Sequence, residues 1–448
     1  MSDVAEAIAY LRSPLAIRAR CEAIFEAGLA GSLGHFAIDL GALPAVVDKV
    51  VEVTRAAYPD LQIPVHGRIN HFRAGGVDRV AELDARLITT ADLAGDAAAD
   101  RDARARAWID LIVVSVLLDA GAGDAWRYVE PGTGCALARS EGLAVASLRA
   151  FEAGVFSSDL ARPLSADAAG LAALDPERLA AAFQVGPDNP LVGFAGRVEL
   201  LRALGAAIAA APAIFPGGRP GGLLDHLDAS LAALPTAGGI HERSEEREGG
   251  DLAGLAGGAG GNAPRGIEAA ALLRALLDGL APIWPGRIEL GGVNLGDVWR
   301  HPAAGGSGPS AGLVPFHKLS QWLAYSLFEP LERTGRQIAQ PGALTGLPEY
   351  RNGGLFIDLG VLVPRRDDIR AAVHAPGDEL VVEWRALTVA LLDRVAEAVR
   401  LRLGKTPAEL PLARVLEGGT WAAGRAVARE RRPGGGPPLH IRSDGTVF

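Results

Sequence analysis

Apolar residues recur every three or four positions along much of this 448-residue chain, the spacing that places them on one face of an α-helix. The longest stripe comprises Phe316, Leu319, Leu323, Leu327 and Leu331. Further helices are predicted over residues 44–58, 103–118, 140–151 and 194–204. Residues 355–364 are expected to form a strand, and residues 378–403 are expected to start extended and continue as a long helix. We therefore expect a mainly α, multi-helix globular fold with a few short strands.

Composition limits the class of partner. Hydrophobic residues make up 49% of the chain and charged residues 22%, which is typical of a globular protein with a sizeable core. The formal net charge is −9, whereas proteins that bind DNA or RNA usually show a basic surface. One phosphate group in a local pocket is compatible with this charge. We therefore expect a small nucleotide-derived substrate and no nucleic-acid partner.

Cysteine usage and the N-terminal sequence bear on location. Only Cys21 and Cys135 are present, so a reducing compartment is favoured over a disulfide framework. The first residues, MSDVAEAIAYLRSP, lack the basic and apolar regions of a secretory signal. The most apolar run, from Ile109 to Leu118, is about half as long as a membrane span. We expect a cytoplasmic protein with no membrane partner.

The stretch from about residue 236 to 265 differs from the rest of the chain. It contains HERSEEREGGDLAGLAGGAGGNAPRG, which is rich in glycine and charge and poor in bulky apolar residues. Motif-rich sequence resumes directly after it. We therefore interpret it as a mobile insertion within a single domain that covers residues 1–448.

The segment VPFHKLSQWLAYSLFEPLE, residues 314–332, contains the first group of candidate ligands. Pro315 is expected to begin a helix, which places Lys318 in the first turn. A cation there is disfavoured by up to about 1 kcal/mol, because the N-terminal end of a helix is positive. A phosphate bound by the N-terminal N–H groups would relieve this conflict, whereas the alternative is a solvated Lys318. His317 and Gln321 are further candidates, although such residues are more often polar groups without a ligand.

A second group lies in LTGLPEYRNGGLFIDLG, residues 344–360, where four polar residues precede a pair of glycines: Glu349, Tyr350, Arg351 and Asn352. Glycine lets a backbone approach a ligand closely, so the pattern predicts a binding loop. The alternative is a turn with solvated charges. Asp358 lies within the following apolar run, so its carboxylate needs a partner or a shifted pKa.

A third group is formed by Glu383 and Arg385, which flank Trp384 in the segment expected to be extended. Alternation along a strand would direct both side chains away from the tryptophan face. They are expected to form a structural ion pair or to close one side of an anionic pocket, and the ion pair is the more common outcome.

The segment IPVHGRINHF, residues 63–72, is polar and aromatic and is interpreted as a loop with possible ligand contacts, His66 among them. His66 and His71 have no third ligand nearby in the sequence, so a metal site is not expected. Motifs for dinucleotides, phosphate-binding loops, zinc proteases and serine hydrolases are absent from the sequence. We expect neither a metal nor a cofactor.

Characteristic stretches lie along nearly the whole chain outside the glycine-rich stretch, among them DLIVVSVLLDAGAGDAWRY, RSEGLAVASLRAFEAGVFS, PIWPGRIELGGVNLGDVW and LTGLPEYRNGGLFIDLGVL. Together they resemble the proteins of the non-reductive uracil catabolic route that passes through ribosylurea. The resemblance implies a role in pyrimidine degradation more directly than it implies a particular reaction.

A more remote similarity concerns the order of IPVHGRINHF, FHKLSQWLAYSL, EYRNGG and VEWRALTVALLD, which is similar to that in queuosine-nucleotide N-glycosidases. Those are helical proteins related in shape to helix-hairpin-helix DNA glycosylases. The similarity implies that Lys318, Arg351 and Arg385 contact a 5′-phosphate and that a carboxylate serves the anomeric carbon. Glu349 stands where that family tends to have aspartate, so Asp358 is a competing choice for the catalytic carboxylate.

The resemblance implies hydrolysis of a ribosylurea phosphate to urea and ribose phosphate. A carboxylate would stabilise the oxocarbenium-like transition state, and phosphate contacts would orient the substrate. The alternative is a non-catalytic binding or scaffold protein of the same pathway. The candidate catalytic residues are Glu349 and Asp358, and the candidate substrate ligands are His66, His317, Lys318, Gln321, Tyr350, Arg351, Asn352, Glu383 and Arg385.

Overall fold

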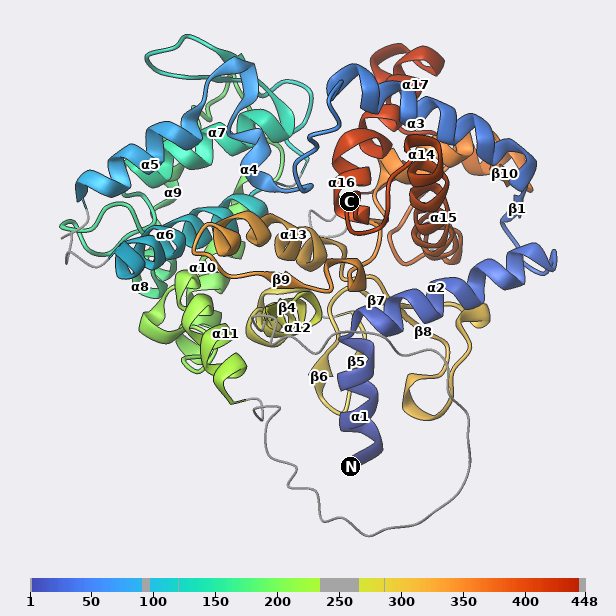
Figure 1. Cartoon of the computed structure of the whole chain (residues 1–448), viewed down its shortest axis with the longest axis horizontal. Coiled ribbons are helices and arrows are strands. Elements are labelled where there is room, and N and C mark those ends of the chain that lie inside the picture. Colours follow the sequence, from blue (N-terminus) through green and yellow to red (C-terminus); the bar gives the residue numbers. More distant parts are fainter. Residues whose placement is uncertain (1, 91–96, 120, 234–265, 286, 443–448) are drawn as a thin grey trace, which may run out of the picture.

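The computed structural model describes residues 2–90, 97–119, 121–233, 266–285 and 287–442 (Figure 1). The expected insertion at about 236–265 lies outside these ranges. The α-helices are α1 (Ser2–Leu11), α2 (Pro14–Leu29), α3 (Leu43–Ala57), α4 (Arg68–His71), α5 (Arg79–Thr90), α6 (Ala97–Leu117), α7 (Arg139–Glu152), α8 (Ala168–Ala172), α9 (Pro176–Ala182), α10 (Phe194–Ala210), α11 (Leu223–Ala232), α12 (Ala269–Gly279), α13 (Lys318–Glu332), α14 (Tyr350–Asp358), α15 (Glu379–Leu403), α16 (Leu412–Val415) and α17 (Trp421–Arg431).

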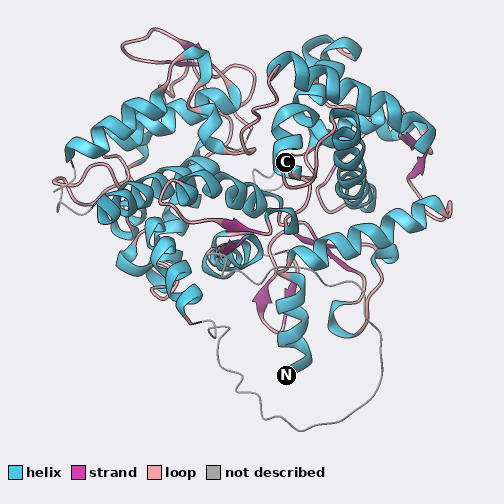
Figure 2. Cartoon of the chain, viewed as in Figure 1, coloured by secondary structure: helices cyan, strands magenta, loops and turns pink. Residues whose placement is uncertain are grey.

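The strands are short and pair two by two, so the fold is mainly α, as predicted (Figure 2). They are β1 (Phe36–Ile38), β2 (Tyr128–Val129), β3 (Ala136–Leu137), β4 (Ile267–Glu268), β5 (Glu289–Leu290), β6 (Val293–Asn294), β7 (Val298–Arg300), β8 (Leu313–Pro315), β9 (Ile338–Ala339), β10 (Leu362–Pro364), β11 (Val373–His374) and β12 (His440–Ile441). The pairs β1–β10, β2–β3, β5–β6 and β7–β8 are antiparallel, whereas β4–β9 and β11–β12 are parallel.

The helices form two groups with α12 and α13 between them (Figure 1). Helices α4 to α11 lie on one side, and α2, α3 and α14 to α17 lie on the other. A continuous cluster of buried apolar side chains extends through both groups, from Ile17 to Leu439. The stripe predicted between residues 316 and 331 is buried within this cluster. No helix in the described part of the chain is both long and apolar enough to span a bilayer.

Local signals place several helix ends correctly. Ser13 caps α2, since its Oγ accepts a hydrogen bond from Ala16 N at 3.2 Å. Helix α3 ends at Ala57, two residues before Pro59, as that proline predicts. The predicted similarity in shape to helix-hairpin-helix DNA glycosylases stays a prediction.

Three local predictions are wrong. Pro315 ends β8 and does not begin a helix, since α13 begins at Lys318. The binding loop and strand expected over residues 349–364 are helix α14 followed by a strand of only three residues, β10. The start of α15 is helical and not extended, although its sequence contains β-branched residues. Nearly every side chain from 380 to 392 is buried, so tertiary packing overrides the local β preference there.

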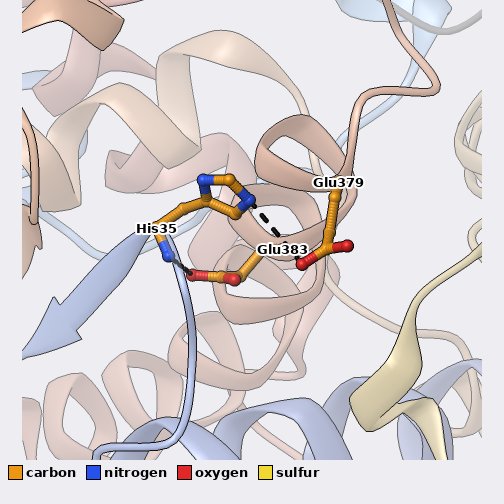
Figure 3. A group of neighbouring side chains, drawn as sticks. All are labelled: His35, Glu379 and Glu383. Atoms are coloured by element: carbon orange, nitrogen blue, oxygen red, sulfur yellow. Dashed lines mark hydrogen bonds and ion pairs between the residues drawn. The ribbon is translucent and has the colours of Figure 1, made fainter.

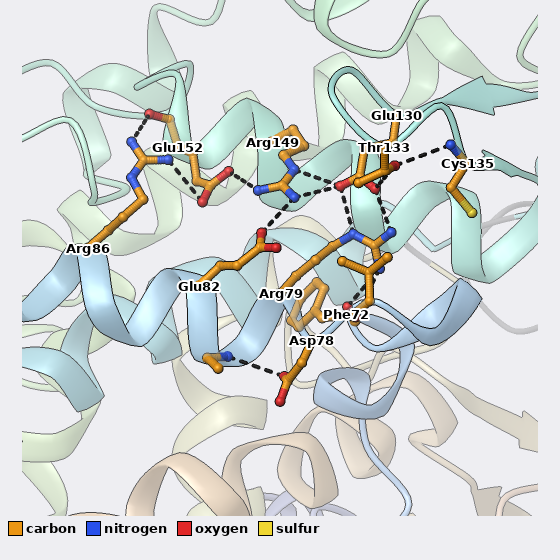
Figure 4. A network of polar contacts seen from close by, with 12 residues as sticks. Phe72, Asp78, Arg79, Glu82, Arg86, Glu130, Thr133, Cys135, Arg149 and Glu152 are labelled. Atoms are coloured by element: carbon orange, nitrogen blue, oxygen red, sulfur yellow. Dashed lines mark hydrogen bonds and ion pairs between the residues drawn. The ribbon is translucent and has the colours of Figure 1, made fainter.

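A buried ion network ties α5 to α7 and to the β2–β3 hairpin (Figure 4). The Glu130 carboxylate accepts hydrogen bonds from Arg79 Nε at 2.7 Å, Arg149 Nε at 2.8 Å and Thr133 Oγ1 at 2.7 Å. Arg79 also donates to the backbone oxygens of Phe72 and Ala74. Desolvation acts to raise the pKa of Glu130, but these hydrogen bonds outweigh it and lower the pKa to about 2. Every charge in this network therefore has a partner of opposite sign.

Candidate functional site

One face of α13 carries Lys318, Trp322 and Ser326, which are spaced four residues apart and therefore lie above one another. This face packs against the segment 65–72, where Ser326 Oγ accepts a hydrogen bond from Arg68 N at 2.9 Å. A Cβ atom on Gly67 would lie 3.0 Å from Ser326 Cα, so the glycine permits this close approach. The Trp322 ring lies 5.7 Å from the Arg68 guanidinium carbon.

Three buried polar nitrogens around Trp322 have no hydrogen-bond partner among the described residues: Trp322 Nε1, Arg68 Nη2 and His71 Nδ1. The His71 ring centroid lies 6.1 Å from that of Trp322. Arg68 Nε donates to Ser115 Oγ at 2.7 Å and Nη1 donates to Ser140 O at 3.3 Å. Nη1 also forms an ion pair with Asp119 Oδ1 at 3.2 Å. Because most buried polar groups in proteins are hydrogen-bonded, unsatisfied nitrogens gathered at one tryptophan mark a candidate ligand site.

Lys318 and Glu349 form the charged part of this site. Desolvation lowers the pKa of Lys318, and Glu349 is the strongest of the charges that oppose this effect. Desolvation raises the pKa of Glu349, and Lys318 acts in the opposite direction. The two side chains therefore act on one another's pKa, yet the described residues hold no ion pair between them within 4.0 Å. Asp119 also acts on Lys318, which connects this pair to Arg68.

Glu349 is positioned as the N-cap of α14. Its Oε2 accepts a hydrogen bond from Arg351 N at 2.7 Å, and its Oε1 accepts one from Asn352 N at 2.5 Å. Gly353 and Gly354, which the sequence predicts to approach a ligand, instead lie within α14 and allow close packing of that helix. A Cβ atom on Gly353 would lie 2.7 Å from Trp384 Nε1, so this glycine lets α14 pack on α15.

The residues after Glu349 are largely bonded within the protein. Arg351 Nη1 donates to Gly435 O at 2.6 Å, whereas its Nε is buried without a hydrogen-bond partner. Asn352 Nδ2 donates to Leu347 O at 3.1 Å, and its Oδ1 is also buried and unsatisfied. The Tyr350 ring lies 4.7 Å from the Arg351 guanidinium carbon. Arg351 and Asn352 thus each retain one unused polar atom.

The N-terminal end of α13 is occupied by a carboxylate of the chain itself. Asp297 Oδ2 accepts a hydrogen bond from Lys318 N at 3.0 Å, and both Asp297 oxygens bind Arg385 at 2.8 Å. Desolvation acts to raise the pKa of Asp297, but Arg385 and the other donors hold it well below its usual range. Asp297 thus already binds the first N–H group of α13 and both Nη atoms of Arg385, whereas a phosphate contact through the Lys318 ammonium group stays a prediction.

Two predicted ligands on the same segment stabilise the fold. Gln321 Nε2 donates to Phe316 O at 3.0 Å and to Thr345 Oγ1 at 2.8 Å, and Gln321 Oε1 accepts from Thr345 N at 2.9 Å. His317 Nε2 donates to Leu11 O at 2.9 Å. The donors and the acceptor of Gln321 are used, so it has no unsatisfied polar group for a substrate.

The predicted carboxylates Asp358 and Glu383 lie elsewhere. Asp358 binds Arg432 through both oxygens at 2.7 and 2.6 Å, which explains how a carboxylate is tolerated in an apolar run. It lies at the opposite end of α14 from Glu349, roughly 13 Å away at 1.5 Å per residue. Glu383 Oε1 accepts hydrogen bonds from His35 N and Phe36 N. The expected pairing of Glu383 with Arg385 is wrong, because residues two apart on a helix face different directions.

His66 approaches the site through Glu417. Its Nδ1 donates to Glu417 Oε2 at 2.7 Å, and its ring centroid lies 6.5 Å from that of Trp322. Desolvation acts to raise the pKa of Glu417, but His66, His71 and Asn70 together outweigh it and the pKa is lowered. Glu417 lies in a π-helical turn, Leu416–Thr420, a conformation that is frequent at functional sites.

Sequence reasoning missed five residues that the fold brings to this place: Arg68, His71, Asp119, Trp322 and Glu417. Helical spacing could have identified Trp322, which follows Lys318 by four positions. Arg68 and His71 lie in the polar and aromatic segment 63–72, but nothing in the local sequence indicates that their side chains are buried. In the described ranges, the residues whose types and spacing fit a metal are His35, Glu379 and Glu383, at the start of α15 (Figure 3).

Comparison with known proteins places the chain among proteins of similar length. The model of the family described as "Protein of unknown function (DUF1688)" matches residues 10–448. "Protein urg3" of Schizosaccharomyces pombe is 38% identical over 448 residues, which cover 99% of this chain and 99% of that protein. "Uracil catabolism protein 4" of Lachancea kluyveri is 35% identical over 470 residues, which cover 98% of this chain and 99% of that protein.

Proposed function

The chain belongs to the DUF1688 family, and from the names of its full-length relatives we propose that it acts in uracil catabolism. Within that role, we propose hydrolysis of the N-glycosidic bond of a ribosylurea phosphate. The reaction adds water across the bond between the anomeric carbon and nitrogen and gives urea and ribose phosphate. The observation that carries this proposal is the group of unsatisfied donors around Trp322, on the helix face shared with Lys318, whose charge interacts with the Glu349 carboxylate.

The donors suit the phosphate end of such a substrate. The Lys318 side chain has no hydrogen bond or ion pair with any described residue, and Arg68 Nη2 is buried without a hydrogen-bond partner among those residues. A phosphate dianion would neutralise the Lys318 ammonium group and supply acceptors for it and for Arg68 Nη2. Trp322 Nε1 lies on the same face of α13 as Lys318 and offers a further donor. Phosphate binding away from the reacting carbon would orient the ribose.

The carboxylate suits the reacting end. As the bond to the urea nitrogen breaks, positive charge builds on the anomeric carbon and its ring oxygen, and an ionised Glu349 would stabilise it. Glu349 would then accept a proton from the attacking water, whose oxygen bonds to the anomeric carbon. The departing urea nitrogen takes up the proton that Glu349 received, so the carboxylate is restored and the products are neutral urea and ribose phosphate. Burial raises the pKa of Glu349 toward neutral pH, and a general acid or base works best when its pKa lies near the working pH.

The test is urea release from ribosylurea 5-phosphate by the purified chain. Glu349→Gln is expected to lower kcat by about 10²–10⁴-fold, the usual size of a general acid–base contribution. Asp358→Asn is the matched control, because Asp358 lies at the other end of the same helix and binds Arg432. It is expected to lower thermal stability and leave kcat unchanged. Absence of urea with folded wild-type protein would overturn the hydrolase proposal.

A second candidate function is binding of the intermediate without catalysis. The observation that favours it is the capping role of Glu349, whose two oxygens already accept backbone hydrogen bonds. A binding protein would be stabilised thermally by ribosylurea 5-phosphate and would release no urea. Lys318→Met would abolish that stabilisation, whereas Glu349→Gln would preserve it.

A further inference from the structure

Four carboxylates are buried in the described part of the chain: Asp110, Glu130, Asp297 and Glu383. The first three each bind arginine, namely Arg219, the pair Arg79 and Arg149, and Arg385. Glu383 has no arginine or lysine within 4.0 Å among the described residues, although its side chain is 0% exposed. A buried carboxylate without a cation is energetically costly, so its surroundings call for a source of positive charge.

Two histidines adjoin Glu383 in place of an arginine. Oε1 of Glu383 accepts hydrogen bonds from His35 N at 3.2 Å and from Phe36 N at 2.8 Å. Its Oε2 is buried without a hydrogen-bond partner, and His301 Nε2, which is also unsatisfied, lies 3.6 Å away. His301 Nδ1 accepts a hydrogen bond from Ala303 N at 3.2 Å, so a neutral His301 carries its proton on Nε2, on the side of Glu383.

A second carboxylate and the His35 ring converge on the same place (Figure 3). Glu379 precedes Glu383 by four positions on α15, so both carboxylates lie on one face of the helix. His35 Nε2 lies 3.7 Å from Glu379 Oε1. The potential ligand atoms of His35, Glu379 and Glu383 all lie within 4.8 Å of one another.

We propose that His35, Glu379 and Glu383 bind one divalent transition-metal ion, with Zn²⁺ as the representative cation. One imidazole nitrogen and two carboxylate oxygens are ligands that this class of ion accepts. Two carboxylates carry two negative charges, which a divalent cation neutralises. The unsatisfied Oε2 of Glu383 would face the cation. His301 would donate to that carboxylate as an orienting neighbour and would not act as a ligand, since its Nδ1 is already an acceptor.

The geometry requires a small closure. Ligand bonds of about 2.0–2.2 Å bring ligand atoms to roughly 3–4 Å from one another, somewhat closer than the widest separation here. The side chains that must move are the accessible ones, because Glu379 is 50% exposed and His35 is 30% exposed. Glu383 is held by two backbone N–H groups and can remain in place. The rigid buried ligand and the two adaptable ones thus form an open site that a cation can enter from solvent.

The site would stabilise the fold. His35 lies just before β1, whereas Glu379 and Glu383 lie in the first two turns of α15. These segments are more than 300 positions apart in the chain, and a shared cation would join them directly. A cation that binds only the folded chain raises the free energy of unfolding, by an amount that grows with the logarithm of its concentration over its dissociation constant. This role is independent of the chemistry proposed at Lys318 and Glu349.

The test is binding of Zn²⁺ to the full chain, freed of any histidine tag and treated with chelator, by equilibrium dialysis and by thermal melting. Wild type is expected to bind one Zn²⁺ per chain and to melt at a higher temperature with it. His35→Gln and Glu379→Gln alter accessible side chains and are each expected to weaken binding by about 100-fold. Glu397→Gln is the matched control, since Glu397 is exposed on the same helix and is expected to leave binding unchanged.

The variants also show which results overturn the proposal. Wild type that binds no Zn²⁺, or Glu379→Gln that binds it as tightly as Glu397→Gln does, would remove the site. Glu383→Gln is informative where it folds, and it is then expected to lose the Zn²⁺-dependent rise in melting temperature. Where it does not fold, His35→Gln and Glu379→Gln still decide the question, because neither side chain is buried.

Discussion

Glu130 and Glu383 are both fully buried carboxylates, and they differ in what surrounds them. Glu130 is enclosed by Arg79, Arg149 and Thr133, which together satisfy its charge and its hydrogen-bonding capacity (Figure 4). Glu383 lies beside His35 and is held on one oxygen by backbone N–H groups (Figure 3). Its second oxygen has no hydrogen-bond partner among the described residues and lies 3.6 Å from His301 Nε2. A complete network needs nothing further, whereas an incomplete one indicates a place for a ligand.

The same contrast separates Asp297 from Lys318, although the two residues are in contact. The Asp297 carboxylate binds Arg385, Trp299 Nε1 and the backbone N–H of Lys318, so it is a structural element. The Lys318 ammonium group has no hydrogen bond or ion pair among the described residues. The side chains proposed to bind substrate are therefore those that the fold holds in place but leaves without partners for their charge or hydrogen bonds.

The largest expected effect comes from breaking the complete network. Glu130→Gln leaves the buried guanidinium group of Arg79 uncompensated, so the free energy of unfolding should fall by about 3–5 kcal/mol. Glu82→Gln is the control, since Glu82 binds the same Arg149 at the exposed edge of the network. It should cost about 1 kcal/mol or less, as measured by denaturant unfolding. Equal losses for the two variants would contradict the distinction between buried and exposed partners.

At the unsatisfied Lys318, a substitution should change the free energy of unfolding in the opposite direction. Lys318→Met removes a desolvated ammonium group without a partner, so it should raise the free energy of unfolding by about 1 kcal/mol. The same change should raise KM for the phosphorylated substrate, because the proposed phosphate contact is lost. Lys405→Met, at a surface pair with Glu409, serves as the control and should leave both quantities nearly unchanged. A destabilised Lys318→Met protein would mean that the lysine has a structural role.

The smallest effect concerns the pH dependence of the free energy of unfolding, to which Glu130 and Glu349 should contribute with opposite signs. The folded-state pKa of Glu130 is lowered to about 2, so its contribution to stability is present above its ordinary pKa of 4.5 and is lost as the pH falls toward 2. The folded-state pKa of Glu349 is raised, so its contribution is present below 4.5 and is lost as the pH rises through the raised pKa. Unfolding of Glu130→Gln and Glu349→Gln against wild type from pH 3 to 7 checks this. The deficit of Glu130→Gln should shrink toward low pH, whereas Glu349→Gln should improve relative to wild type toward high pH.

Helix positions were predictable wherever the signal is local. Apolar spacing identified α13, and the pattern over residues 44–58 identified α3 to within one residue at each end. The prediction failed at α14 because its N-cap is Glu349, which is outside the residue types preferred there, and because Leu355–Asp358 contains an apolar run that resembles a strand. It failed at the start of α15 because that helix is buried on all sides, which removes the periodic pattern.

The sequence by itself determined the helical character of the chain, its acidic balance and its family, because these depend on local spacing, on composition or on similarity along the whole chain. Only the tertiary structure decided which charges are satisfied. Arg79 and Glu130 are 51 positions apart, Asp358 and Arg432 are 74 apart, and Asp297 and Arg385 are 88 apart. Ion pairing depends on distances of a few ångströms between such segments, and a carboxylate that will meet an arginine looks the same in sequence as one that will not.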